Sequence, residues 1–281
     1  MANAARNSTQ GAPLKNGLVA ALDVGTTKTV CFIGRVVGEN KARVVGIGHQ
    51  VSRGLRAGSV ADMEAVESSV RAAVDAAERM AGEPIHTAFV NVSCGDPASH
   101  TVGVDIPVTG NEIDDADVRR VLDQGTARSD NGEREVIHAI PVTYTVDGTS
   151  GIRDPRGMYG TQLGVNMHIV TASAGPVRNL HSCIKRGHLD VAGTVVSSYA
   201  AGLATLVEDE KDLGVTLIDM GGGTTSVAVF YDGSLVFADV VPLGGQHVTN
   251  DIARGLATPT GHAERMKTLY GSALAGPSDE E

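Results

Sequence analysis

Two short stretches of the sequence combine an aspartate, a glycine turn and threonines in an order that suits phosphate and a hydrated metal ion. In the first, Asp23 ends an apolar run and Gly25 follows it. In the second, Asp219 ends the apolar run 215–218, and the glycines 221–223 come next. Glycine turns let backbone N–H groups approach an anion closely, and a neighbouring carboxylate can hold Mg²⁺ on phosphates through water. The pattern predicts a site for a phosphate-bearing ligand.

Each stretch has the layout of a β-hairpin, with a buried apolar strand, the turn, and a returning strand rich in β-branched residues. A single copy could be an ordinary glycine hairpin without a ligand. Two copies far apart in the sequence indicate two related half-domains that face one ligand. The tips add a positive charge at Lys28 and hydroxyl donors at Thr26, Thr27, Thr224 and Thr225.

Composition narrows the class of protein. The chain has 281 residues, 42% of them hydrophobic and only 3% aromatic, so a globular core must be built from Val, Ile, Leu and Ala. Its formal charge is −10, from 33 acidic and 23 basic residues. No Lys/Arg cluster stands out, which argues against nucleic-acid binding.

The cysteines show no sign of a metal or redox site, and the N-terminal segment shows no sign of a signal peptide. Cys31, Cys94 and Cys183 lack metal or redox spacing, so we expect buried free thiols in a reducing cytoplasm. No apolar run is long enough for a membrane span. The polar segment 1–16 lacks the apolar core of a signal peptide and is predicted to be a disordered tail.

Periodicity predicts the elements that carry the two tips. A long helix is expected over 63–80, with Ser59 and Asp62 as a capping arrangement. A second helix is expected to start at Pro176 and to end at Gly187. A short helix of small residues is expected over 197–206. The predicted strands are 42–51, 85–92, 102–108, 135–146, 165–172 and 191–196.

Between the hairpins the sequence pattern changes to short predicted elements, acidic loops and turns. We interpret 87–165 as an inserted subdomain. Within it, Pro141 interrupts a strand, which suits a sheet edge or a bulge. Further on, Gly244 and Gly245 precede a helix. Such a turn can be a simple loop or can serve phosphate at the helix N-terminus, and the sequence leaves both readings open.

Other phosphate, metal and nucleophile motifs are missing. The sequence has no Gly-x-x-x-x-Gly-Lys-Ser/Thr loop and no Gly-x-Ser-x-Gly elbow. The glycines at 221–223 lack the third glycine of a dinucleotide fingerprint and lie between strands, not before a helix. The nine histidines form no metal-ligand pair at helical spacing.

The stretches 23–26 and 219–224 resemble the two phosphate motifs of the actin, Hsp70 and sugar-kinase superfamily. Within it, the sequence is most similar to the FtsA family of bacterial cell-division proteins. That resemblance rests on Ser-Arg-Gly at 52–54, His-Ala-Ile-Pro at 138–141, the Gly-rich loop 151–157 and Ala-Glu-x-x-Lys at 263–267. It extends from about residue 18 to residue 271.

The resemblance implies an α/β fold of the actin-like (ribonuclease H-like) class. Two related halves would face each other, with an inserted 1C subdomain and an incomplete second half. The implied divisions are subdomain 1A at 17–86 and 166–211, subdomain 1C at 87–165, the first part of subdomain 2A at 212–243, and the start of subdomain 2B, truncated, at 244–281.

The resemblance also implies ATP and Mg²⁺ in the cleft between the halves. The implied phosphate-binding residues are Asp23, Gly25, Thr26, Thr27, Lys28, Gly221, Gly222, Gly223, Thr224 and Thr225. The implied metal contacts, through water, are Asp219 and Asp23. The implied ribose and adenine contacts are Gly244, Gly245, Glu264 and Lys267. Where readily hydrolysing relatives have Glu or Gln at the head of a helix, this sequence has Ser197 and Ser198, so we expect slow hydrolysis at best.

As a member of this family, the protein would link filaments of the tubulin-like protein FtsZ to the inner membrane, recruit other divisome proteins and self-associate into filaments. It would lie in the cytoplasm, peripheral to the inner membrane at the division site. The family's membrane helix and the rest of its second half are expected beyond this sequence. The alternatives are a small-molecule kinase, which would need a catalytic Asp and a sugar pocket in 87–165, and a chaperone-like ATPase.

Overall fold

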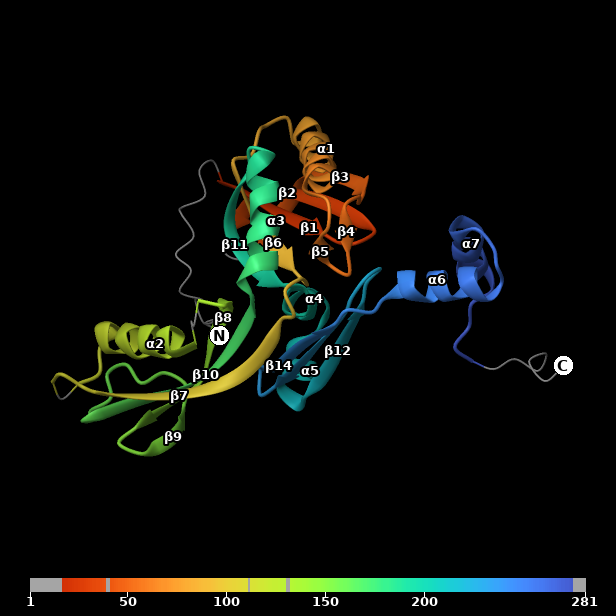
Figure 1. The fold of residues 1–281 in the computed structure, drawn as a ribbon. Helices are drawn as coiled ribbons and strands as arrows, with labels where there is room; N and C mark the ends of the chain where they lie inside the picture. Colours follow the sequence, from red (N-terminus) through yellow and green to blue (C-terminus); the bar gives the residue numbers. More distant parts are fainter. Residues whose placement is uncertain (1–16, 39–40, 111, 130–131, 275–281) are drawn as a thin grey trace.

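The computed structural model describes residues 17–38, 41–110, 112–129 and 132–274 (Figure 1). The predicted tail 1–16 lies outside the described residues. The strands form a five-stranded sheet, a seven-stranded sheet and a two-stranded ribbon of β4 (Leu55–Arg56) and β5 (Ser59–Val60). The two large sheets carry one hairpin each.

The five-stranded sheet has the order β11-β6-β1-β2-β3. Its strands are β1 (Leu18–Val24), β2 (Lys28–Gly38), β3 (Lys41–Val51), β6 (Thr87–Val92) and β11 (Asp190–Val196). The first hairpin is antiparallel, whereas β1, β6 and β11 run parallel. The carboxyl ends of these three parallel strands therefore meet at one edge of the sheet, beside the first hairpin tip.

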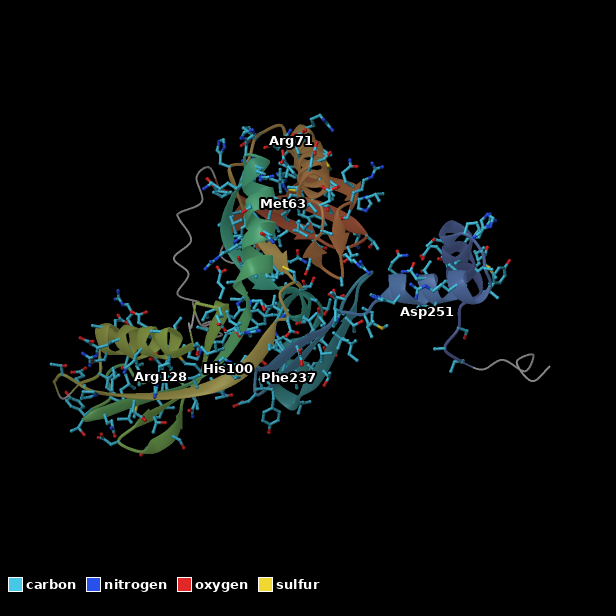
Figure 2. The ribbon with its side chains drawn as sticks, viewed as in Figure 1. Met63, Arg71, His100, Arg128, Phe237 and Asp251 are labelled. Carbon is cyan, nitrogen blue, oxygen red and sulfur yellow. The ribbon has the colours of Figure 1, made fainter. Side chains whose placement is uncertain are left out.

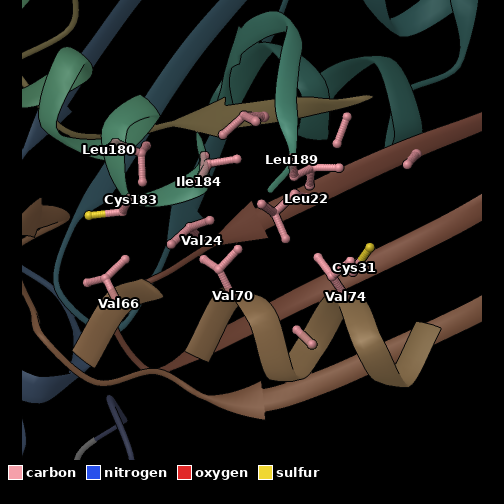
Figure 3. Packing of buried hydrophobic residues seen from close by; sticks show 14 of the residues in the cluster. Leu22, Val24, Cys31, Val66, Val70, Val74, Leu180, Cys183, Ile184 and Leu189 are labelled. Atoms are coloured by element: carbon pink, nitrogen blue, oxygen red, sulfur yellow. The ribbon is translucent and has the colours of Figure 1, made fainter. Parts of the chain in front are cut away.

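Two helices cover one face of this sheet, α1 (Met63–Ala81) and α3 (Ala174–Arg186). Apolar residues at helical spacing on α1, such as Val66, Val70 and Val74, pack toward Leu22 of β1 and toward α3 (Figure 3). The predicted long helix is confirmed. This packing fixes β1, and with it the strand end at Asp23.

Both helices start differently from the prediction. Asp62 is itself the N-cap of α1, because its carboxylate accepts the backbone N–H groups of Glu64 and Ala65 at 3.1 Å each. The predicted capping arrangement from Ser59 is wrong, since β5 occupies that position. Helix α3 begins at Ala174, so Pro176 is in the first turn and not at its first residue, where a missing N–H still costs no hydrogen bond.

The seven-stranded sheet has the order β12-β13-β14-β7-β10-β8-β9. Its strands are β7 (Ala98–Pro107), β8 (Arg134–Val146), β9 (Thr149–Ile152), β10 (Gln162–Ser173), β12 (Val215–Met220), β13 (Thr225–Tyr231) and β14 (Ser234–Val241). Its helices are α2 (Asp115–Ser129), against β7, β8 and β10, and α4 (Ser197–Thr205), against β12, β13 and β14. Strands β14 and β7 pair at one position, Asp239 with Ala98.

Strand β10 contributes to all three hydrophobic cores. Leu163, Val165, Met167 and Ile169 belong to the core under α2. Val170 belongs to the core under α4, and Ala172 to the core of the five-stranded sheet. The segment 87–165 is therefore not a separable unit at its edges. Its first strand, β6, pairs in the five-stranded sheet, and position 165 falls inside β10. The sequence of β6 contains no signal that it pairs in parallel with β1 and not with the strands of the inserted segment.

The second hairpin is less buried than predicted. Strand β12 is at the edge of its sheet, and Ile218 is 61% exposed, so the reading of 215–218 as a buried strand is wrong. Exposed Phe237 of β14 lies on the same face (Figure 2). The other face packs on α4, where Gly202 meets the ring of Phe230 so closely that a side chain would overlap it. The small residues predicted for this helix thus permit close packing.

Two local predictions are confirmed. The pairing of β8 with β10 shifts register beside Pro141, which is the expected bulge. The three cysteines are free and buried, and burial raises the pKa of Cys31 to about 12 and that of Cys94 to about 11.

Two further helices follow the second hairpin, α6 (Gly245–Gly255) and α7 (Thr260–Tyr270), and α5 (Glu208–Leu213) precedes it. Within the described ranges, no helix has the length and apolarity to cross a membrane.

Candidate functional site

The two hairpin tips have the same turn. In the first, the backbone N–H of Gly25 donates to the carbonyl oxygen of Lys28 at 3.0 Å. In the second, the N–H of Gly221 donates to the carbonyl oxygen of Thr224 at 2.8 Å. Both bonds join residues three apart, directly after the strand that ends in Asp-x-Gly. The similarity seen in the sequence therefore extends to the backbone.

The tips lie against each other. A side chain on Gly222 would overlap that of Thr27, and a side chain on Gly223 would overlap that of Thr26. None of the glycines at the two tips has a positive φ. The second tip needs glycine for close approach to the first tip, and not for an unusual backbone conformation.

A cavity of about 380 Å³ lies between the tips. Its walls come from both sheets and from the end of β6 and the start of α4. The lining residues are Asp23, Gly25, Thr26, Thr27, Lys28, Asn91, Ser93, Ser197, Asp219, Met220, Gly221, Gly222, Thr224 and Ser226. Most of the predicted phosphate and metal residues are thus brought to one place.

Asp23 is the most perturbed acid of the cavity. Burial raises its pKa above the usual value, and the negative charge of Asp219 adds to this effect. A hydrogen bond from Asn91 and the positive charge of Lys28 oppose it without cancelling it. Two carboxylates near one another favour a cation between them. A divalent cation bound between Asp23 and Asp219 would offset the repulsion between their negative charges.

The donor set fits a magnesium ion that is shared with phosphates. Mg²⁺ is usually held by one or two carboxylates, with substrate phosphates and water completing the octahedron. Asp23 and Asp219 provide these two carboxylates on one cavity. Among the described residues no group of three His, Cys, Asp or Glu side chains is placed to hold a metal.

The remaining predicted residues do not line this cavity. Gly223 is buried in the contact between the tips. Thr225 donates its hydroxyl to the carbonyl oxygen of Leu243 at 2.8 Å. The N–H of Gly245 donates to Gly221 at 3.0 Å, and Gly244 packs on the same tip. These three residues tie the second glycine turn to the second hairpin tip.

Glu264 and Lys267 belong to a polar network between α6 and α7. The ammonium of Lys267 donates to the carbonyl oxygen of Gly245 (3.1 Å), to the hydroxyl of Thr249 (2.9 Å) and to Glu264 (2.8 Å). Thr249 also donates to Glu264. The bonds from Lys267 and Thr249 lower the pKa of the Glu264 carboxyl. A role toward ribose or adenine stays a prediction for this pair.

Sequence reasoning missed Asn91, Ser93, Met220 and Ser226 as lining residues. Asn91 and Ser93 lie at the end of β6, where polar residues interrupt an apolar strand. Ligands of parallel sheets bind at the carboxyl ends of strands, so a polar residue at such an end was an available signal. Met220 and Ser226 are register neighbours of the tip, which no motif identifies.

Sequence comparison identifies the family through two segments. The sequence profile described as "SHS2 domain inserted in FTSA" matches residues 95–171, and the one described as "Cell division protein FtsA" matches residues 216–281. The first range begins after β6 and ends within β10. The second contains the second hairpin, α6 and α7.

Curated relatives agree with these matches. FtsA of Agrobacterium fabrum is 46% identical over 276 residues, which cover 95% of this chain and 62% of the relative. FtsA of Pseudomonas aeruginosa is 38% identical over 258 residues, covering 92% and 62%. FtsA of Escherichia coli is 32% identical over 262 residues, covering 92% and 61%. The chain thus spans about three fifths of the length of these relatives.

Solved structures share the fold. The PilM–PilN type IV pilus biogenesis complex matches with a TM-score of 0.63 at 17% identity, over 90% of this chain and 70% of that one. The ethanolamine utilization protein EutJ of Carboxydothermus hydrogenoformans matches with a TM-score of 0.52 at 17% identity, over 92% and 64%. At such identities only the fold is shared. The predicted fold class is confirmed, and the chain belongs to the FtsA family of actin-like cell-division proteins.

Proposed function

We propose that the protein binds Mg·ATP between its two hairpin tips. The observation that carries this proposal is the pair of matching Asp-x-Gly turns that face one cavity, each with its own carboxylate. Asp219 and Asp23 would hold the metal through water. The tip residues, with the hydroxyls of Thr26 and Thr224 and the ammonium of Lys28, would surround the phosphates, because these residues line one concave space.

We expect hydrolysis to be slow. The residue of the cavity that heads α4 is Ser197. Near neutral pH its hydroxyl is a poor base, so it cannot take a proton from an attacking water. Bound ATP would then act mainly as a structural ligand that joins the two halves. The protein would be a nucleotide-dependent assembly factor more than an efficient ATPase.

We propose that in the cell the protein has the role that its family resemblance implies. It would join FtsZ filaments to the inner membrane, recruit other divisome proteins and self-associate. Support comes from the FtsA relatives and profile matches. The protein would lie peripherally on the cytoplasmic face of the membrane at the division site.

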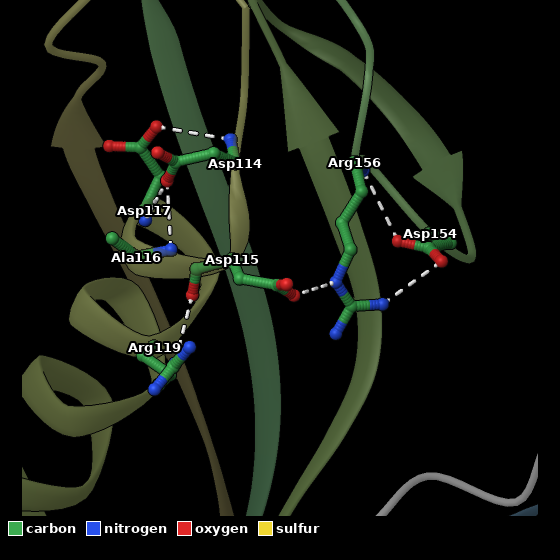
Figure 4. A network of polar contacts seen from close by, with 7 residues as sticks. All are labelled: Asp114, Asp115, Ala116, Asp117, Arg119, Asp154 and Arg156. Atoms are coloured by element: carbon green, nitrogen blue, oxygen red, sulfur yellow. Dashed lines mark hydrogen bonds and ion pairs between the residues drawn. The ribbon is translucent and has the colours of Figure 1, made fainter.

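The acids of the inserted segment argue against the kinase alternative. Asp114 caps α2 by accepting the N–H groups of Ala116 (2.8 Å) and Asp117 (2.9 Å) (Figure 4). Asp115 pairs with Arg156 at 2.6 Å. Asp114 and Asp115 thus have structural partners, and no described acid of 87–165 lines the cavity between the tips. No acid of this group is placed as a catalytic base beside a phosphate site.

A calorimetric titration of the full-length protein tests the proposal. Because the tips would hold phosphates, ATP and ADP with Mg²⁺ should bind, while adenosine should bind far more weakly. Filaments of FtsZ should co-sediment the protein in the same buffer. Equal affinity for adenosine and ATP would contradict the phosphate clamp, and binding of ATP without co-sedimentation would contradict the FtsZ role alone.

A further inference from the structure

Asn91 makes three hydrogen bonds at the point where β1, β6 and α4 meet. Its side-chain oxygen accepts the backbone N–H of Val24 at 2.9 Å. Its side-chain nitrogen donates to Oδ1 of Asp23 at 2.6 Å and to the hydroxyl of Ser197 at 3.0 Å. Both ends of the amide are therefore used, by groups from two other elements.

These partners fix the orientation of the amide. The N–H of Val24 requires an acceptor, and the carboxylate of Asp23 requires a donor. The flipped amide would place an NH₂ group against the N–H of Val24 and an oxygen against the carboxylate, losing both bonds. The Asn91 side chain therefore has one orientation, and it holds the Asp23 carboxylate from a single side.

The position on β6 explains the geometry. Val90 pairs with Leu22 of β1, and Asn91 pairs with Val195 of β11. The end of β6 thus lies between the ends of the two strands that lead to Asp23 and to Ser197. A residue at this place can touch the first hairpin and the head of α4 at once.

We propose that Asn91 is a positioning residue for Asp23, which keeps the carboxylate facing the cavity and ties it to the head of α4. This inference rests on the proposed Mg·ATP site. Asn91 contacts Asp23 and not the opposite tip, so it acts on the metal side of the site through that carboxylate. Without the amide, the Asp23 side chain is free to turn among rotamers that do not face Asp219.

The test is a double-mutant cycle on the full-length protein with Asn91→Ala, Asp23→Ala and the double variant. ATP affinity is titrated with and without Mg²⁺, and melting is recorded without ligand. We expect Asn91→Ala to weaken the binding of Mg·ATP about tenfold, which is the usual effect of losing one charge-assisted hydrogen bond. The binding of metal-free ATP should weaken by less than about twofold. In the Asp23→Ala background the Asn91 change should have no further effect.

Asn166→Ala, an exposed asparagine on β10, is the matched control and should match wild type. Equal losses with and without Mg²⁺, or full additivity with Asp23→Ala, would assign Asn91 to the framework of the sheet and overturn the inference. If Asn91→Ala does not fold, Asn91→Ser is tested in its place. Failure of both variants to fold would also assign Asn91 to the framework of the sheet and overturn the inference. Absence of ATP binding by the wild type would instead reject the proposed site.

Discussion

A side chain on Gly222 would overlap the methyl group of Thr27 in the opposite tip, so the absence of a side chain is what allows this contact. We predict that Gly222→Ala pushes the tips apart and weakens Mg·ATP about tenfold, since overpacking of this kind costs on the order of 1–3 kcal/mol. Adding Thr27→Ser removes the overlapping methyl group and should restore part of the affinity. Gly255→Ala, with nothing near its side-chain position, is the control. An unchanged affinity in Gly222→Ala would show that the tips do not need this contact.

His168 is a buried residue that the proposed function does not use. It is 1% exposed, and neither ring nitrogen has a partner among the described residues. Burial, with a contribution from the charge of His100, lowers its pKa to about 4. The unfolded chain binds this proton near the ordinary pKa of 6.5, so stability is lost as the pH falls from 6.5 toward 4.

We therefore predict that His168→Leu flattens the pH dependence of stability. Between pH 7.5 and pH 5, the variant should lose about 2 kcal/mol less unfolding free energy than wild type, measured by urea denaturation. His86→Gln, at an exposed histidine, should leave the pH dependence as it is. A His168→Leu curve parallel to that of wild type would contradict this prediction, because it would mean that the imidazole has the same pKa in the folded and unfolded states.

At the residue scale, the sequence identifies the chemistry but not all of its supports. The aspartates and glycines of the tips stand in a motif, so their convergence at one cavity could be foreseen. Asn91 has no motif, because its role depends on which strands are neighbours in the sheet. The contacts of Lys267 with α6 likewise depend on the packing of two helices that the sequence does not specify.

At the scale of elements, the helix pair α6 and α7 is attached to the second tip by the glycine turn and by Lys267. We predict that Lys267→Met, which keeps the apolar stem but removes three donors, increases hydrogen exchange in α7 without ligand, by roughly tenfold for a loss of about 1.4 kcal/mol. Exchange in β1 and β2 should not change. Arg265→Met, exposed on the same helix, is the control.

The two explanations for Lys267 are separated by this experiment. Faster exchange in the ligand-free variant supports the structural tether. Unchanged exchange in the ligand-free protein, with weakened nucleotide binding, would contradict the tether and would favour the ribose or adenine role suggested by the resemblance.

Elements with strong local periodicity could be predicted, while those set by tertiary contacts could not. Helix α1 and both hairpins follow from apolar spacing and glycine turns. The exposure of β12 and the placement of β6 beside β1 could not be foreseen, because an apolar strand reads the same at the edge and in the middle of a sheet. The cap of α1 was missed because Ser59 and Asp62 are both good capping residues.

At the scale of the whole molecule, the inserted segment and the first half share strands. Removing 87–165 would take away β6, which lies between β11 and β1, and part of β10, which reaches all three cores. We predict that this deletion variant does not fold, as seen by loss of a cooperative melting transition. Replacing 148–160, which contains only β9 and the loop after it, with a short Gly/Ser linker should preserve the transition. A folded 87–165 deletion that binds ATP would contradict this account.

Asp219 provides the most direct test of whether the two hairpin tips hold Mg·ATP between two carboxylates. The residue lies one position before the end of an edge strand and lines the cavity, so Asp219→Ala removes a charge without removing apolar packing. ATP is titrated into the full-length wild type, into Asp219→Ala and into Asp251→Ala, an exposed acid of α6, with and without Mg²⁺. We predict that Asp219→Ala weakens the binding of Mg·ATP about tenfold to a hundredfold and leaves the binding of metal-free ATP nearly unchanged. The variant should melt at the same temperature as wild type. Equal loss in both conditions would contradict this arrangement.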